Sequence, residues 1–295
     1  MHAPSSISSL YFSAPDGLRL HALDAGPRTD GRLPAICLPG LARTAEDFRE
    51  LIEALAFDRK NPRRVLALDS RGRGLSAHDP DAANYAVPIE LGDVLALLDT
   101  QAITRAVFIG TSRGGILTMT LGAVRPRAIA GAVLNDIGPV LEMKGLLRIK
   151  GYVGRLPKPA NYAEGVELLQ TIMGSQFPAL GAAAWNLYAR RTWRENNGAG
   201  LVSWYDPAIS KTLESIDPGE RPQPLWPQFD ALAHAPLMVV RGEHSDLLSR
   251  ETVDAMHARR ADLEALEIAG QGHAPLLTAK ETIEPIVKFV ARCDA

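Results

Sequence analysis

The segment Gly110-Thr111-Ser112-Arg113-Gly114 places a serine between two glycines, directly after the apolar run 106–109. This segment fits the pattern G-x-S-x-G, in which a sharp strand-to-helix turn exposes a nucleophilic hydroxyl. The glycines allow the strand and the helix to approach closely, and the helix start directs its positive dipole end toward a developing oxyanion. Ser112 is therefore predicted to be a nucleophile. The same pattern also occurs by chance, so this prediction depends on a base and an acid that can serve the serine.

A serine hydroxyl attacks a carbonyl only when a base accepts its proton. Seven histidines are candidates: His2, His21, His78, His234, His244, His257 and His273. His273 is the predicted base, because it lies in the loop 270–275 between the last predicted strand and the last helical segment. In a parallel sheet this loop lies at the carboxyl edge, where α/β active sites form. His244 is the alternative base, whereas His21, His234 and His257 are expected to be structural or solvated.

The base needs a carboxylate that fixes its tautomer and stabilises the imidazolium. Asp246 is the predicted acid, because it follows the apolar run 237–240 at the same edge of the sheet. In this arrangement the orienting acid usually follows the next-to-last strand. Asp136, which follows the run 129–134, is the alternative acid. If Asp246 orients the base, Asp136 is expected to organise the loop that comes after its own strand.

Short apolar runs alternate with helical segments over two parts of the chain. Such runs are typical of buried parallel strands, and strands of this kind are predicted at 35–38, 65–68, 106–109, 129–134 and 237–240. A further strand is predicted at 263–268. Helical spacing of apolar residues predicts helices at 48–55, 89–98, 114–124, 250–260 and 280–291. Residues 10–14 and 18–24 flank Pro15-Asp16-Gly17 and are predicted to form a hairpin. The alternation indicates the α/β class, with a mostly parallel, doubly wound sheet.

The alternation stops between residues 139 and 228, which contain helical patches and all four tryptophans. We predict a helical cap at 139–228, inserted into a core domain made of residues 1–138 and 229–295. The aromatic residues of the cap could form an apolar roof over the site, although for most of them the simpler interpretation is a small core within the cap. The candidates for substrate contact are Trp185, Tyr188, Trp193, Trp204 and Tyr205.

The order Ser112, Asp246, His273 resembles the α/β-hydrolase family, and the resemblance extends over essentially the whole chain. It implies that Leu38-Pro39-Gly40-Leu41 is the loop in which the backbone N–H of Leu41 pairs with that of Arg113 as an oxyanion hole. The family usually has histidine where this chain has Pro39. The segment 69–76 resembles a structural loop of the family, and the insertion resembles the family's cap.

The resemblance implies a serine hydrolase that cleaves small to medium carboxylic esters through an acyl-enzyme intermediate. Ser112 argues against epoxide hydrolases and haloalkane dehalogenases, which have an aspartate at this turn. Two alternatives remain open. One is a C–C bond hydrolase that acts on ring-cleavage dienoates, and the other is a non-catalytic ligand-binding member of the fold.

Composition excludes several other classes of protein. The net charge is −2 and the hydrophobic fraction is 46%, so we expect a globular protein with no nucleic-acid partner. No apolar stretch approaches the roughly 20 residues that span a bilayer, and residues 1–14 lack the pattern of a signal peptide. We therefore expect a cytoplasmic protein with no membrane partner. Two cysteines make no disulfide framework, and no metal or cofactor motif is seen, so we expect no metal and no cofactor.

Overall fold

One eight-stranded sheet forms the centre of the computed structural model, which describes residues 6–28 and 31–294. The strand order is β1-β2-β4-β3-β5-β6-β9-β10. The hairpin β1–β2 and the pair β2–β4 are antiparallel, and the other neighbours are parallel. This confirms the predicted α/β fold and its mostly parallel sheet. The strands are β1 (Ser8–Ser13), β2 (Arg19–Ala25), β3 (Ala35–Leu38), β4 (Val65–Asp69), β5 (Ala106–Thr111), β6 (Ile129–Asn135), β9 (Leu237–Gly242) and β10 (Glu264–Ile268).

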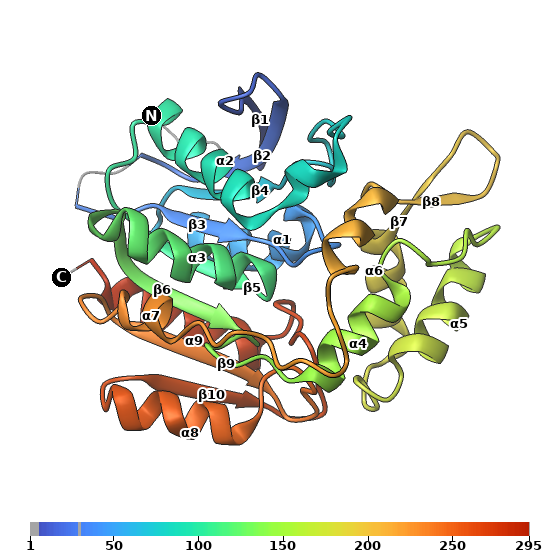
Figure 1. The fold of residues 1–295 in the computed structure, drawn as a ribbon. Coiled ribbons are helices and arrows are strands. Elements are labelled where there is room, and N and C mark those ends of the chain that lie inside the picture. The colour runs from blue at the N-terminus through green and yellow to red at the C-terminus, as the bar shows by residue number, and fades with distance from the viewer. Residues whose placement is uncertain (1–5, 29–30, 295) are drawn as a thin grey trace.

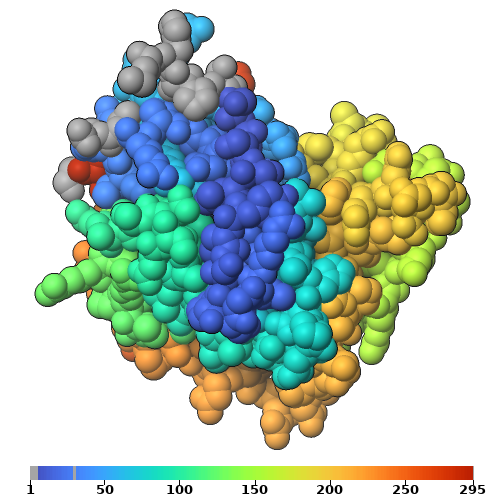
Figure 2. All heavy atoms as spheres, turned by 90° about the horizontal axis from the view of Figure 1, so that it is seen from above, coloured from blue at the N-terminus to red at the C-terminus, as the bar shows by residue number. Residues whose placement is uncertain are grey.

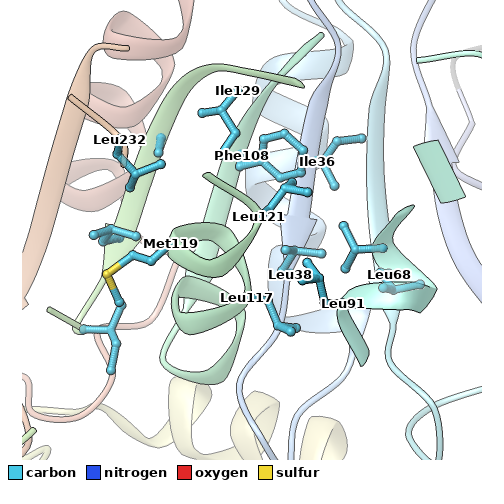
Figure 3. Packing of buried hydrophobic residues seen from close by; sticks show 14 of the residues in the cluster. Ile36, Leu38, Leu68, Leu91, Phe108, Leu117, Met119, Leu121, Ile129 and Leu232 are labelled. Atoms are coloured by element: carbon cyan, nitrogen blue, oxygen red, sulfur yellow. The ribbon is translucent and has the colours of Figure 1, made fainter. Parts of the chain in front are cut away.

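Helices cover both faces of the sheet (Figure 1). On one face lie α2 (Val87–Thr100), α3 (Arg113–Val124), α7 (Trp226–Asp230) and α8 (Arg250–Arg259), and on the other lie α1 (Arg49–Ala56) and α9 (Lys280–Arg292). The first apolar cluster lies between the sheet and α2, α3, α7 and α8, and the second lies between the sheet and α1 and α9. Successive side chains of β5 point to opposite faces of the sheet, so Phe108 packs in the first cluster and Ile109 in the second. Figure 3 shows Phe108 close to Ile36 of β3 and Leu121 of α3. Short 3-10 helices are η1 (Ala45–Phe48), η2 (Ala82–Tyr85) and η3 (Pro126–Ala128).

The chain between β6 and β9 forms a separate lobe next to the carboxyl ends of the central strands (Figures 1 and 2). It contains α4 (Met143–Tyr152), α5 (Tyr162–Met173), α6 (Ala182–Thr192), η4 (Pro207–Leu213) and a hairpin of β7 (Trp193–Glu195) and β8 (Leu201–Ser203). A third apolar cluster holds α5, α6, β7 and β8 together, whereas buried residues of α4 and η4 belong to the first cluster. The predicted end of the cap, residue 228, falls inside α7, where Phe229 is buried in the first cluster. We therefore propose a core domain and an inserted cap as predicted, except that the cap ends before α7 begins at Trp226.

Within 6–28 and 31–294, no helix has both the length and the apolar composition that crossing a bilayer requires.

Candidate active site

Ser112 occupies a sharp turn between the end of β5 and the start of α3. Its φ of 49° lies in the left-handed region that few non-glycine residues adopt, at a cost of about 1–3 kcal/mol. Close packing around the turn retains this conformation. A methyl group on Gly110 would overlap with the backbone of Gly114, and one on Gly114 would overlap with the Leu38 carbonyl. The glycines therefore allow the strand and the helix to approach closely, with the serine between them.

His273 lies against this serine, with 2.9 Å between its Nε2 and Ser112 Oγ. Two side chains hold the loop that carries it. Gln176 Oε1 accepts a hydrogen bond from the His273 amide at 2.9 Å, and Asn135 Nδ2 donates to the Pro275 carbonyl at 3.0 Å. Neither Gln176 nor Asn135 was predicted from the sequence, because a lone amide side chain has no recognisable pattern.

Asp136, and not Asp246, contacts the histidine. The distance from His273 Nδ1 to Asp136 Oδ2 is 2.8 Å, and Asp136 is fully buried. Its carboxylate also accepts hydrogen bonds from the amide of Gly242 at 2.7 Å and from the hydroxyl of Ser245 at 2.6 Å. These three contacts fix the orientation of the carboxylate. The prediction that Asp246 orients His273 is therefore wrong, and the alternative acid is the one in contact.

The two aspartates differ in their distance from the sheet. Asp136 is the first residue after β6, and its own amide donates to the Val240 carbonyl at 2.7 Å, so it stays at the sheet edge. Asp246 is the fourth residue after β9 and turns toward the inserted lobe. There it forms a two-point ion pair with Arg148 of α4, at 2.6 and 2.8 Å. Immediate adjacency to a strand end was the signal in the sequence that favoured Asp136.

Leu41 and Arg113 both border the cavity that contains Ser112. Within the part of the chain that the structure describes, neither amide donates a hydrogen bond to a protein acceptor. Arg113 is the first residue of α3, where backbone N–H groups have no partner inside the helix. Both amides therefore remain free to bind a ligand.

A cavity of about 340 Å³ lies between the sheet edge and the inserted lobe, and Ser112 and His273 border it. Most of its other side chains are aliphatic, and they include Ile137, Leu141, Leu146, Ile149, Val153, Leu169, Met173 and Leu213. The charged Arg43 at the wall is matched by Asp47, with Nε–Oδ2 and Nη2–Oδ1 distances of 2.7 and 2.6 Å. The cavity therefore suits an apolar or neutral ligand group beside the serine.

Comparison with known proteins gives the family. Residues 35–284 match the family model of alpha/beta hydrolases. The chain is an α/β-hydrolase. A 3-hydroxybutyrate-oligomer hydrolase from Cupriavidus necator is 34% identical over 256 residues, which cover 81% of this chain and 82% of the relative. A 2-(acetamidomethylene)succinate hydrolase from Mesorhizobium japonicum is 24% identical over 77% of this chain and 78% of its own.

The fold of this chain is also similar to that of a solved α/β-hydrolase structure. An α/β hydrolase from Novosphingobium aromaticivorans superposes with a TM-score of 0.88 and 40% identity, and the match covers 97% of this chain and 98% of that one. Because relatives that match most of this chain are hydrolases, the protein has hydrolase activity.

Two of the five predicted aromatic contacts border the cavity of this α/β-hydrolase, namely Tyr188 and Tyr205. Burial raises the pKa of both phenols, so they present neutral hydroxyls. The predictions for the other three are wrong. None of the three borders the cavity. Trp185 and Trp193 are buried in the core of the inserted lobe, and the Trp204 indole donates to the Arg190 carbonyl at 3.2 Å.

Aliphatic residues of the inserted lobe take the place of the tryptophans at the cavity. Leu146, Ile149 and Val153 recur at helical spacing along and just beyond α4 and face the site. That spacing was the available signal, but the same spacing also describes an ordinary core face.

The remaining candidates lie away from the serine. The side chain of His244, the alternative base, is 39% exposed and lies 3.9 Å from Glu243. His2 lies outside the described residues. Both cysteines, Cys37 and Cys293, are buried free thiols. Among residues 6–28 and 31–294, no group of three His, Cys, Asp or Glu side chains could hold a metal ion.

Proposed function

We propose that this α/β-hydrolase cleaves small to medium carboxylic esters through an acyl-enzyme on Ser112. One observation carries the proposal: a hydrogen-bonded chain of Ser112, His273 and Asp136 opens onto a largely apolar cavity. The relative named as a 3-hydroxybutyrate-oligomer hydrolase supports an ester substrate, since such oligomers are joined by carboxylic ester bonds. We further propose a cytoplasmic enzyme whose partner is a small-molecule ester.

In the acylation step, Ser112 Oγ attacks the ester carbonyl carbon while His273 Nε2 accepts the hydroxyl proton. The Asp136 carboxylate accepts the hydrogen bond of Nδ1–H, which selects the tautomer with a free Nε2 and stabilises the imidazolium. The amides of Leu41 and Arg113 donate to the oxygen of the tetrahedral intermediate as its negative charge develops. His273 then returns the proton to the leaving alcohol oxygen, and the acyl group stays on Ser112.

In the deacylation step the same groups act on water. His273 Nε2 accepts a proton from the attacking water, whose oxygen adds to the acyl carbonyl. The second oxyanion accepts the same two amide hydrogen bonds. As it collapses, the bond to Ser112 Oγ breaks and His273 Nε2 returns its proton to that oxygen, which releases the carboxylic acid and restores the Ser112 hydroxyl. The apolar wall excludes bulk water, which strengthens the polar interactions around the reacting carbonyl.

A chain-length panel tests the substrate class. For aryl acetate, butyrate, octanoate and palmitate, we expect a burst of alcohol release and a preference for the shorter chains. The acetate and butyrate should exceed the palmitate in kcat/KM by about tenfold or more, because the cavity is enclosed by the inserted lobe. A ring-cleavage dienoate is measured under the same conditions. Turnover of the dienoate orders of magnitude above every ester would instead support a C–C hydrolase, and no ester turnover would support a ligand-binding protein.

Covalent labelling tests the nucleophile, and the chain contains an internal comparison. Ser9, His21 and Asp69 form a second hydrogen-bonded chain, with distances of 3.0 Å and 2.7 Å, but none of them borders the cavity. A fluorophosphonate followed by peptide mass spectrometry should label Ser112 and leave Ser9 unmodified, because Ser112 borders the cavity with the proposed amide donors, whereas Ser9 lies in β1 and does not border it. The label should be lost in Ser112→Ala and kept in Ser9→Ala. Labelling of Ser9, or any label that survives Ser112→Ala, would contradict the assignment.

A further inference from the structure

The two amides of the proposed oxyanion hole come from separate parts of the chain. Leu41 lies in the loop after β3, and Arg113 lies at the start of α3. Donors of this kind act only when they lie about 2.7–3.1 Å from the position of the developing oxyanion. Their efficiency therefore depends on how rigidly the two segments are held relative to each other.

A buried arginine anchors the first segment. Arg73 is 1% exposed, and its Nε donates to the Leu41 carbonyl at 2.8 Å. The carbonyl and the amide of Leu41 belong to the peptide groups on either side of one Cα atom, so a fixed carbonyl restricts the orientation of the amide. The Nη1 atom of Arg73 donates to the Arg71 carbonyl at 2.6 Å and to Glu90 Oε1 at 2.5 Å.

The same glutamate anchors the second segment. Glu90 lies in α2 and is 1% exposed, and its other oxygen, Oε2, accepts from Arg113 Nε at 2.7 Å. Arg113 Nη2 also donates to the Tyr85 carbonyl at 2.8 Å. One buried carboxylate thus joins the arginine that holds Leu41 to the side chain of Arg113 itself. Glu90 does not border the cavity, so it has no direct contact with the substrate.

We propose that Glu90 is a positioning residue that sets the spacing of the two oxyanion donors. This inference rests on the proposed function, because it concerns the same tetrahedral intermediate. The loop that carries Arg73 is also fixed from the inserted lobe, since the Gly74 amide donates to the Trp204 carbonyl and the Asp206 amide donates to the Gly72 carbonyl, both at 2.7 Å. Arg73, which connects Glu90 to Leu41, therefore lies in a loop that is fixed both by Glu90 and by the inserted lobe.

The direction in which kcat changes in Glu90→Gln distinguishes a positioning role of Glu90 from an effect of its negative charge alone. Glu90 carries the negative charge of this cluster, between Arg73 and Arg113. If Glu90 acted only through its field, Glu90→Gln would make the surroundings of the oxyanion more positive and would raise kcat. If Glu90 positions the donors, the same change loosens both segments and lowers kcat.

The test measures kinetics and inhibitor binding of the full chain with an aryl butyrate. For Glu90→Gln we expect kcat to fall about 10-fold to 100-fold, less than for loss of a donor, because the amides are displaced and not removed. The KM should change by a factor of about two, since Glu90 lies outside the cavity wall. The affinity for a trifluoromethyl ketone, whose adduct with Ser112 carries an oxyanion, should fall by the same factor as kcat.

The matched control is Asp93→Asn. Asp93 lies one turn further along α2, is equally buried, and pairs with Arg71 at 2.7 and 2.6 Å. It contacts neither Arg73 nor Arg113 through its side chain, so we expect a loss of thermal stability with kcat within about threefold of the unmodified enzyme. Equal losses of kcat in the two variants, or an unchanged or higher kcat in Glu90→Gln, would overturn the proposal.

A second variant keeps the test decisive if Glu90→Gln does not fold. Arg113→Gln keeps the backbone amide but breaks the ion pair with Glu90, and the Arg113 side chain is 16% exposed, so the fold should tolerate it. We expect kcat and ketone affinity to fall together in this variant also, and unchanged values would overturn the inference. Failure of the unmodified enzyme to hydrolyse any ester would refute the proposed function, whereas normal catalysis in these variants would refute only the role of Glu90.

Discussion

Replacing His273 with alanine is expected to lower kcat for ester hydrolysis by about four orders of magnitude. The imidazole is the group within hydrogen-bond distance of the Ser112 hydroxyl, at 2.9 Å, and without it the serine proton has no acceptor at neutral pH. Water and the remaining amide donors should support only residual turnover. The measurement is the steady-state rate with an aryl butyrate, together with the amplitude of the initial burst.

His244→Ala is the matched control for this prediction. His244 is the other histidine of the carboxyl edge that the sequence favoured, but its side chain is exposed and pairs only distantly with Glu243. We expect its kcat to stay within about twofold of the unmodified enzyme. A loss in His244→Ala as large as that in His273→Ala, with both variants folded by circular dichroism, would refute the choice of base.

Asp136→Asn is expected to have the second large effect, a fall in kcat of about 10⁴-fold. The asparagine side chain can present an N–H to Nδ1, which then holds its proton on Nε2 and can no longer accept one from Ser112. The contact of 2.8 Å and the complete burial of Asp136 leave no water to replace the carboxylate. Single-turnover acylation with the same aryl ester measures this step directly.

Asp246→Asn provides the comparison. Its carboxylate pairs with Arg148 on both oxygens, so the change should weaken the attachment of α4 and lower the free energy of unfolding by about 1–3 kcal/mol. The kcat should fall only a few fold, because the change alters the position of α4 at the cavity but leaves Ser112, His273 and Asp136 in place. A far greater kcat loss in Asp246→Asn than in Asp136→Asn, in soluble folded variants, would return the orienting role to Asp246.

The local features of the site followed from the sequence. The two glycines around Ser112 are needed because strand, serine and helix meet within one turn, and that need depends on neighbouring residues alone. The parallel strands were also predictable, since apolar runs such as 35–38 and 106–109 are buried on both faces of the sheet. The loop 270–275 comes after the last strand, so its place at the carboxyl edge, and that of His273, followed from the order of the elements.

Tertiary structure decided the contacts between distant segments. Asp136 and Asp246 both follow strands that end at the same edge, and the packed structure decides which carboxylate meets the imidazole: Asp136 lies 2.8 Å from His273, whereas Asp246 pairs with Arg148 of α4. The tryptophans of the inserted lobe were predicted to contact substrate because they are large aromatic residues, but Trp185 and Trp193 pack in the core of the lobe itself.

Glu90 illustrates the same limit. In the sequence it is one acidic residue in a helix, but in the fold a single buried carboxylate touches two arginines from segments 17 and 23 residues away. The residues of a turn and the apolar pattern of a strand depend on positions close together in the chain, so the sequence alone predicts them. Side-chain pairs of this kind form between elements whose distance and orientation exist only after the sheet, its helices and the inserted lobe have packed together.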